Sequence, residues 1–205
     1  GARLVLLGHG EAGKTSLQRG LRARAPRPSA VDDRTIQLDI YSLVLGEMGT
    51  PRQVLLSMWD LAGQPQYAAG LQPYIVDGSL YLLTVPALDV HSLNASHSDY
   101  LGRWLNYLEV GAPNAIVLPV LTKCDMLPGA DALPSHQRTH EKFTELAKAQ
   151  LEWFKDGINR HLAQQDGNSR LQIEPVVQCL SSVEGGDISL ETMRTRLEEI
   201  VFSEP

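Results

Sequence analysis

The sequence predicts an α/β fold in which a six-stranded, mostly parallel sheet has one antiparallel edge hairpin and helices on both faces. Short apolar runs of the kind found in buried parallel strands, such as residues 4–7 and 79–85, alternate with amphipathic helical patterns. A glycine-rich loop at residues 8–16 joins the first strand to the first helix. A turn-rich segment at residues 46–51 separates two neighbouring strand patterns, which predicts the hairpin.

Composition limits the class of protein. The chain has 205 residues, of which 43% are hydrophobic and 20% charged, so we expect residues 1–205 to form one domain. The net charge of −6 provides no general attraction to nucleic acid or to anionic membranes. The two cysteines, Cys124 and Cys179, are far apart in the sequence and favour buried thiols in a reducing compartment. Because we find neither a membrane span, a signal peptide nor a lipidation motif, we expect a cytoplasmic domain excised from a longer protein.

The first half of the chain predicts a helix, a loop and the hairpin. A helix should cover residues 14–24, and the prolines within residues 25–29 should end it. Residues 35–45 alternate between apolar and polar side chains, as a half-buried strand does, and residues 54–59 supply the second strand of the hairpin.

The second half continues the alternation of strands and helices. Apolar residues recur at helical spacing over residues 98–110, which predicts a helix with one buried face. Residues 116–121 have the pattern of a strand, but Pro119 lacks the N–H that a central strand donates, so we expect a bulge or a locally broken ladder. The remaining expected elements are a loop at 127–138, a long helix from residue 139 to about 163, a strand at 171–180 and a closing helix at 189–201.

The glycine-rich loop has the pattern of a phosphate cradle. It follows G-x-x-x-x-G-K-[ST], with Gly8, Gly13, Lys14 and Thr15 at the fixed positions. The glycines permit backbone angles that a Cβ forbids, and the loop N–H groups face the anion together with the positive end of the following helix. Lys14 is expected to neutralise the outer phosphates, and Thr15 to coordinate Mg²⁺. The residues expected to line this cradle are Gly8, His9, Gly10, Glu11, Ala12, Gly13, Lys14, Thr15 and Ser16.

The cradle does not identify the nucleotide or the reaction. ATPases, small-molecule kinases and GTP switches all share it. One loop residue, His9, occupies a variable position, where it could touch phosphate, contact a dimer partner or be a plain loop residue.

A second group of residues follows the second hairpin strand. Asp60 stands where it can hold Mg²⁺, usually through water, and the Gly63 N–H can touch the γ-phosphate. Gln64 stands where an attacking water has to be oriented.

A third group follows the strand at residues 116–121 and predicts the base. Guanine presents N–H donors at N1 and N2, which the Asp125 carboxylate can accept, whereas adenine would be repelled there. The Lys123 stem can lie along the base, and Thr122 precedes it in the T-K-x-D string. The string is weak alone, but its position after the cradle and after Asp60 favours a guanine reader.

This order of motifs resembles the Ras-like small GTPases, which have a P-loop NTPase fold. Thr35 corresponds to the first switch, and Asp60 to Gln64 to the second. Ser181, Ser182 and Val183 correspond to the last base contact, although Val183 departs from the lysine that the family often has. Residues 34–40, 100–105 and 111–114 further resemble the Roc domain of Roco proteins.

The resemblance implies a molecular switch that binds GTP and GDP and slowly hydrolyses GTP. Mg²⁺ would be held by Thr15, Thr35 and Asp60, while Lys14 neutralises charge and Gln64 aligns the attacking water. Arg34 could act as an arginine finger, in cis or across a dimer, or be a surface residue.

The resemblance also implies partners. A Roc module lies between repeats and a COR domain of the same chain and is often a homodimer, whereas the effector is not implied. Two other functions stay open. The domain could be a dimerisation or scaffold module that binds the nucleotide for stability and hardly hydrolyses it, or an ATP-using kinase, which Asp125 opposes.

Overall fold

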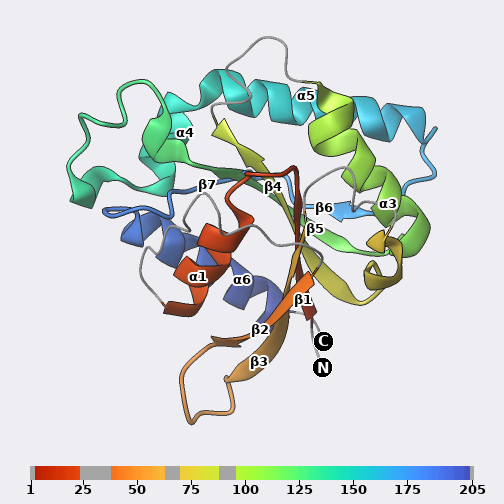
Figure 1. Ribbon diagram of the computed structural model, residues 1–205, viewed down its shortest axis with the longest axis horizontal. Coiled ribbons are helices and arrows are strands. Elements are labelled where there is room, and N and C mark those ends of the chain that lie inside the picture. The colour runs from red at the N-terminus through yellow and green to blue at the C-terminus, as the bar shows by residue number, and fades with distance from the viewer. Residues whose placement is uncertain (1–2, 24–37, 63–69, 88–95, 204–205) are drawn as a thin grey trace.

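The computed structural model describes residues 3–23, 38–62, 70–87 and 96–203, which form one sheet between two layers of helices (Figure 1). The strands lie in the order β2-β3-β1-β4-β5-β6, and β7 also pairs with β5. All pairs are parallel except β2 with β3, so the predicted α/β class and its antiparallel edge hairpin are confirmed. The strand bounds are β1 Arg3–Gly8, β2 Leu38–Leu45, β3 Val54–Leu61, β4 Ser79–Pro86, β5 Ile116–Thr122, β6 Gln172–Ile173 and β7 Gln178–Cys179.

The last strand differs from the prediction. We expected one strand over residues 171–180 and therefore six strands, but the described residues form seven because this segment is divided into β6 and β7. Pro175 lies between the two halves. Because Gln172 and Glu174 donate to β5, the alternation of the strand turns the Pro175 nitrogen away from β5, so its missing N–H does not cause the interruption. Both halves still pair with β5 in parallel.

The broken ladder expected at Pro119 is confirmed. On the β4 side, the register runs unbroken through Pro119, which pairs with Leu83. On the other side, β5 pairs with β6 at Ile116 and Val117 and with β7 only from Val120 onward. The carbonyls that accept bonds on this side belong to Ala115, Val117 and Leu121, and the alternation of the strand places the Pro119 nitrogen on the same side. The missing donor therefore faces the gap between β6 and β7.

Two predicted helices are less regular than expected. The helix predicted over residues 98–110 begins with a π-helical turn, Ser98–Gly102, before α3. The long helix predicted from residue 139 is interrupted at Ala147, where ψ is +21°, so it forms α4 and α5. The helix bounds are α1 Lys14–Ala23, α3 Arg103–Gly111, α4 His140–Leu146, α5 Lys148–Gln164 and α6 Asp187–Ser203. No helix in these described ranges is both long and apolar enough to cross a bilayer.

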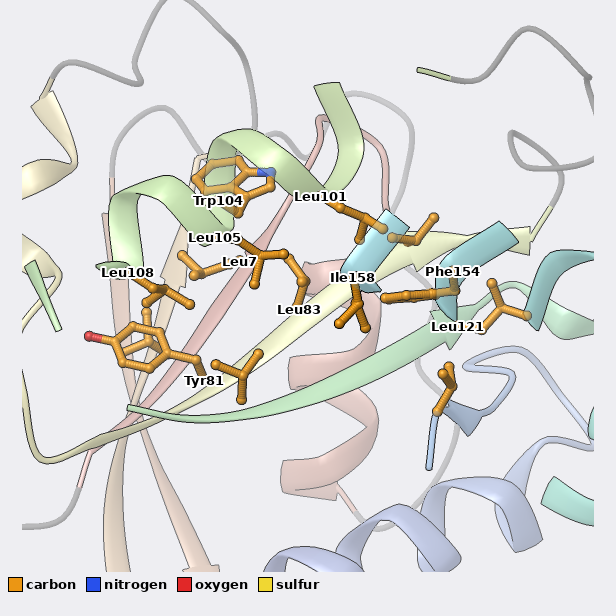
Figure 2. Packing of buried hydrophobic residues seen from close by; sticks show 14 of the residues in the cluster. Leu7, Tyr81, Leu83, Leu101, Trp104, Leu105, Leu108, Leu121, Phe154 and Ile158 are labelled. Atoms are coloured by element: carbon orange, nitrogen blue, oxygen red, sulfur yellow. The ribbon is translucent and has the colours of Figure 1, made fainter. Parts of the chain in front are cut away.

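Each face of the sheet carries its own apolar core. Side chains alternate along a strand, so Leu7 and Leu83 lie on one face, while Leu6 and Leu82 lie on the other. Figure 2 shows the first core, where α3 and α5 cover β1, β4 and β5. In Figure 1, α1 and α6 lie on the opposite face and enclose the second core.

Parallel pairing directs the carboxyl ends of β1, β3, β4 and β5 to one edge of the sheet. These strands end at Gly8, Leu61, Pro86 and Thr122. In doubly wound sheets, this edge is where ligands bind. The three predicted groups of site residues therefore meet at the same edge.

Candidate functional site

The glycine-rich loop connects β1 to α1, and its two fixed glycines are required for different reasons. Gly8 has a φ of +151°, and a Cβ there would lie 2.3 Å from Thr84 Oγ1 and 2.4 Å from Thr84 O. Gly13 has a φ of +81°, but a Cβ there would meet only ordinary contacts, 3.5 Å from Thr122. Space and backbone conformation thus both demand glycine at position 8, whereas backbone conformation alone demands it at position 13.

The left-handed residue in the middle of the loop is Glu11, with a φ of +65°, while Gly10 does not have a positive φ. A non-glycine residue in this conformation costs about 1–2 kcal/mol. Glu11 is exposed, whereas Ala12 beside it is fully buried. The loop therefore carries backbone strain at Glu11.

Lys14 is buried and aimed by backbone carbonyls. Its Nζ donates to Gly8 O and to His9 O, at 2.9 Å each. Burial lowers the pKa of Lys14 to about 8, and the nearby Asp60 carboxylate partly opposes this shift. A phosphate beside this buried ammonium group would supply a negative charge that stabilises the protonated form of Lys14.

Thr15 and Asp60 bring hard oxygen atoms together beside Lys14. The Thr15 hydroxyl donates to Asp60 Oδ2 at 2.7 Å, and the Asp60 side chain is fully buried at the end of β3. A hydroxyl and a carboxylate are the donors that Mg²⁺ prefers. The described residues contain no group of three or more His, Cys, Asp or Glu side chains suited to a metal. A magnesium ion here would therefore need further oxygen ligands, such as those of phosphates.

The predicted base reader follows β5 directly and is bonded to the phosphate loop. The Thr122 hydroxyl donates to Ala12 O at 2.5 Å and lies 3.3 Å from Val85 O. Lys123 adopts a left-handed conformation, with a φ of +56°, and its Cε lies 3.9 Å from where a Gly13 Cβ would be. The end of β5 thus lies directly against the loop that begins α1.

Asp125 is held by the loop that follows β7. Ser181 Oγ donates to Asp125 Oδ1 at 2.7 Å and accepts from the Val183 N–H at 3.3 Å. Ser181 itself is fixed because its N–H donates to Ser189 Oγ at 3.1 Å. Ser182 is buried, and Val183 is half-buried. The structure therefore brings the predicted last base contact to the base reader.

The ring of His9 packs against the π-helical turn that precedes α3. Its ring stacks on Tyr100, with the ring centroids 5.0 Å apart, and its Nδ1 donates to Gly10 O at 3.0 Å. The His9 carbonyl accepts from Lys14 and from the Ala12 N–H. The backbone of His9 belongs to the cradle, whereas its side chain contacts the π-helical turn.

Four predicted site residues lie outside the described residues: Arg34, Thr35, Gly63 and Gln64. Sequence reasoning also missed two residues that support the site. Thr84 donates to Leu7 O at 2.8 Å and lies against Gly8, and Ser189 holds Ser181. Thr84 could have been noticed as a polar residue in an otherwise apolar strand pattern, but nothing nearby marks Ser189.

Comparison with known proteins decides the family. The sequence model of the family described as "Roc: Ras of Complex, Roc, domain of DAPkinase" matches residues 3–125, more than half of the chain. The chain belongs to the Roc family. The resemblance to Roc found in the sequence is thereby confirmed.

Two proteins similar to this Roc chain are longer than it is. A Roc-COR-CHAT protease of Runella zeae is 31% identical over 107 residues, which are 48% of the Roc chain and 11% of that protein. The solved structure of Methanosarcina barkeri Roco2 RocCORdC bound to GDP has a TM-score of 0.58 and 21% identity, and it covers 98% of the Roc chain. The Roc chain spans 49% of that solved chain. At this level of identity, the likeness establishes the fold, which agrees with the predicted Ras-like architecture.

Proposed function

We propose that this Roc domain is a guanine-nucleotide switch that binds GTP and GDP with Mg²⁺ and slowly hydrolyses GTP to GDP and phosphate. The observation that carries the proposal is the hydrogen bond from the Thr122 hydroxyl to Ala12 O. It joins the loop suited to phosphates to the segment suited to guanine, so one nucleotide can span both. The Methanosarcina protein was solved bound to GDP, which agrees with this ligand class.

In this proposal, the base is read by Asp125. Its carboxylate accepts the guanine N1 and N2 donors, while Ser181 fixes its orientation through Oδ1. Lys123 lies along the base, and the Ser182 amide binds the guanine oxygen. Val183, which replaces the more usual lysine, contributes its backbone to this loop.

The phosphates lie in the cradle of residues 8–16, which faces them with N–H groups and the α1 N-terminus. Lys14 neutralises the outer phosphates, and its two carbonyl acceptors hold it in the cradle. Because little covalent chemistry is required of the protein in phosphoryl transfer, positioning and charge neutralisation supply most of the catalysis.

The residues present fit a magnesium ion. Thr15 and Asp60 provide oxygen donors, and the sequence motif adds the hydroxyl of Thr35. When bound, Mg²⁺ would neutralise the charge that develops on the phosphates. We propose that Asp60 holds the ion through a water molecule.

We assign hydrolysis to residues that the sequence motifs identify. Gln64 aligns the attacking water, Gly63 and Thr35 contact the γ-phosphate, and Arg34 is a candidate arginine finger. Without an arginine at the developing charge, related switches turn over at roughly 10⁻⁴ s⁻¹, so we expect slow intrinsic hydrolysis.

A single-turnover assay tests the reaction. The domain loaded with GTP should release phosphate faster than its Gln64→Leu variant. Equal, background-level release from both would support the alternative, a nucleotide-stabilised dimerisation or scaffold module.

A competition assay tests the base. GTP carrying a fluorescent label should be displaced by GDP but not by ATP. Asp125→Asn should weaken guanine binding selectively, while Asp131→Asn, at an exposed position on the following loop, provides a matched control. Displacement by ATP as readily as by GDP would favour an ATP-using kinase instead.

We further propose that the domain acts within a Roco protein, next to a COR domain and repeats of the same chain, and forms a homodimer there. The COR modules in the names of both relatives support the first part. A reducing, cytoplasmic setting is supported by Cys124 and Cys179, which are free and buried. Burial raises the pKa of the Cys124 thiol well above its ordinary value, which keeps it protonated.

A further inference from the structure

Four aromatic rings form a continuous column from the phosphate loop to α5. His9 stacks on Tyr100 with centroids 5.0 Å apart and an interplanar angle of 29°. Tyr100 meets Trp153 edge to face at 6.2 Å and 79°, and Trp153 stacks on His97 at 4.6 Å and 22°. We call these four residues the ring column. Offset-stacked and edge-to-face arrangements of this kind are the favourable geometries for aromatic pairs.

The ring column is anchored at its far end by backbone and helix contacts. His97 Nε2 donates to the Trp153 carbonyl at 3.0 Å and lies 3.9 Å from an Asp156 carboxylate oxygen. Gly157 allows this approach, because a Cβ there would lie 2.6 Å from both the His97 ring and a Leu101 methyl group. Glycine is unfavourable in the interior of a helix, so Gly157 in α5 indicates close packing at this position.

The Tyr100 ring of the column belongs to the π-helical turn. Tyr100 lies in Ser98–Gly102, where the Arg103 N–H bonds to Ser98 O, five residues earlier. Such turns insert an extra residue into a helix and are frequent at functional sites. The irregular start of the α3 helix is thus one of the parts of the fold that contact the phosphate loop.

His9, at the near end of the ring column, is also a residue whose carbonyl orients Lys14. The His9 ring is held on one side by Tyr100 and by its own Nδ1 bond to Gly10 O. The His9 carbonyl in turn accepts from Lys14 Nζ. The orientation of this carbonyl therefore depends on a side chain that Tyr100 fixes.

We propose that Tyr100 is a positioning residue for the phosphate loop, holding Lys14 in place through His9, with Trp153 on α5 and His97, just before the π-helical turn, as its support. This inference rests on the proposed function, because the group that Lys14 meets is the phosphate of the nucleotide. It adds that α5, which reaches the loop through Trp153 and Tyr100, stabilises nucleotide binding.

The test measures release of GDP carrying a fluorescent N-methylanthraniloyl label. Removing the stack with Tyr100→Leu should speed release about two- to twelvefold, the range expected for one aromatic pair. Tyr100→Phe keeps the ring and should restore the wild-type rate. Tyr107→Leu is the matched control, because Tyr107 is half-buried on α3 and pairs with Trp104 instead of the loop.

Two further measurements separate positioning from general stability. GDP affinity should fall in Tyr100→Leu while GMP affinity stays constant, since GMP lacks the outer phosphate that Lys14 serves. The His9 ring resonances of the nucleotide-free protein should shift in Tyr100→Leu and not in Tyr107→Leu. Should Tyr100→Leu fail to fold, His9→Ala removes the same stack from the loop side and should speed GDP release equally.

Each outcome decides the inference. Equal GDP release from the wild type, Tyr100→Leu and His9→Ala would overturn the positioning role and leave guanine-nucleotide binding intact. Equal acceleration by Tyr100→Leu and Tyr107→Leu would also overturn it, because the effect would then be loss of packing. A wild-type protein that retains no labelled GDP would overturn both this inference and the proposed function.

Discussion

The hydroxyl of Thr122 is the smallest group whose removal should disconnect the two halves of the proposed site. Thr122→Val keeps the shape of the side chain but removes the donor to Ala12 O and the contact with Val85 O. Thr122 is 2% exposed and Ala12 is fully buried, so water cannot easily replace the donor. A buried acceptor left unsatisfied costs about 1–3 kcal/mol.

This loss of about 1–3 kcal/mol is divided between two measurements. The part already felt by the nucleotide-free fold lowers its free energy of unfolding, measured by urea denaturation. The part felt only in the bound state accelerates release of fluorescently labelled GDP, by at most about 150-fold, because every 1.4 kcal/mol is a factor of ten.

The control is Thr84→Val on the neighbouring strand. Thr84 is also fully buried and also donates to a carbonyl of the β1 segment, Leu7 O at 2.8 Å, but it does not contact the base reader. It should lower the unfolding free energy by a similar amount and change GDP release much less. Our reasoning that Thr122 links the base reader to the phosphate loop would be refuted if both variants released GDP at the same rate.

Three further predictions concern the same edge of the sheet. Ser181→Ala removes the donor to the Asp125 carboxylate and should weaken GDP binding by about 1.5–3 kcal/mol, measured by calorimetry; an unchanged affinity would contradict the role of this contact. Gly8→Ala should lower the free energy of unfolding by about 2–6 kcal/mol, through a backbone clash and strain, against about 1–2 kcal/mol for Gly13→Ala, and equal losses in urea denaturation would contradict the packing argument. Burial lowers the Lys14 pKa from 10.5 to about 8, so the unfolded chain binds more protons between these values and stability should rise with pH. Relative to Lys14→Met, the nucleotide-free wild type should gain at most about 3 kcal/mol from pH 8 to pH 10.5, and a flat difference would show that Lys14 is solvated.

Local patterns in the sequence were enough to predict most helices and strands and to name the residues of the candidate site. The cradle, the hairpin and the base reader each consist of consecutive residues whose types suit one backbone conformation or one chemical role. Even the ladder defect at Pro119 followed from a single missing N–H. The strand prediction overlooked the division of the last strand, although Pro175 marks the place where it occurs.

Other features had no local signal. Apolar periodicity continues across Ala147, so the separation of α4 from α5 is not visible in the pattern. The π-helical turn at Ser98–Gly102 and the stacking of His9 on Tyr100 depend on how α3 packs on the sheet. The contact of His9 with Tyr100 therefore could not be predicted from the loop sequence.

The amino-acid sequence by itself determined which residues we propose for the chemistry, because a glycine at a tight turn, a lysine suited to an anion and a carboxylate suited to guanine are recognised from single positions and short spacings. Only the tertiary structure decided which of these residues meet. Thr122 and Ala12 are 110 positions apart, and Asp125 and Ser181 are 56 apart, yet each pair is joined by one hydrogen bond. Such contacts follow from the order of strands in the sheet, which results from packing of the whole chain and cannot be deduced from any one segment.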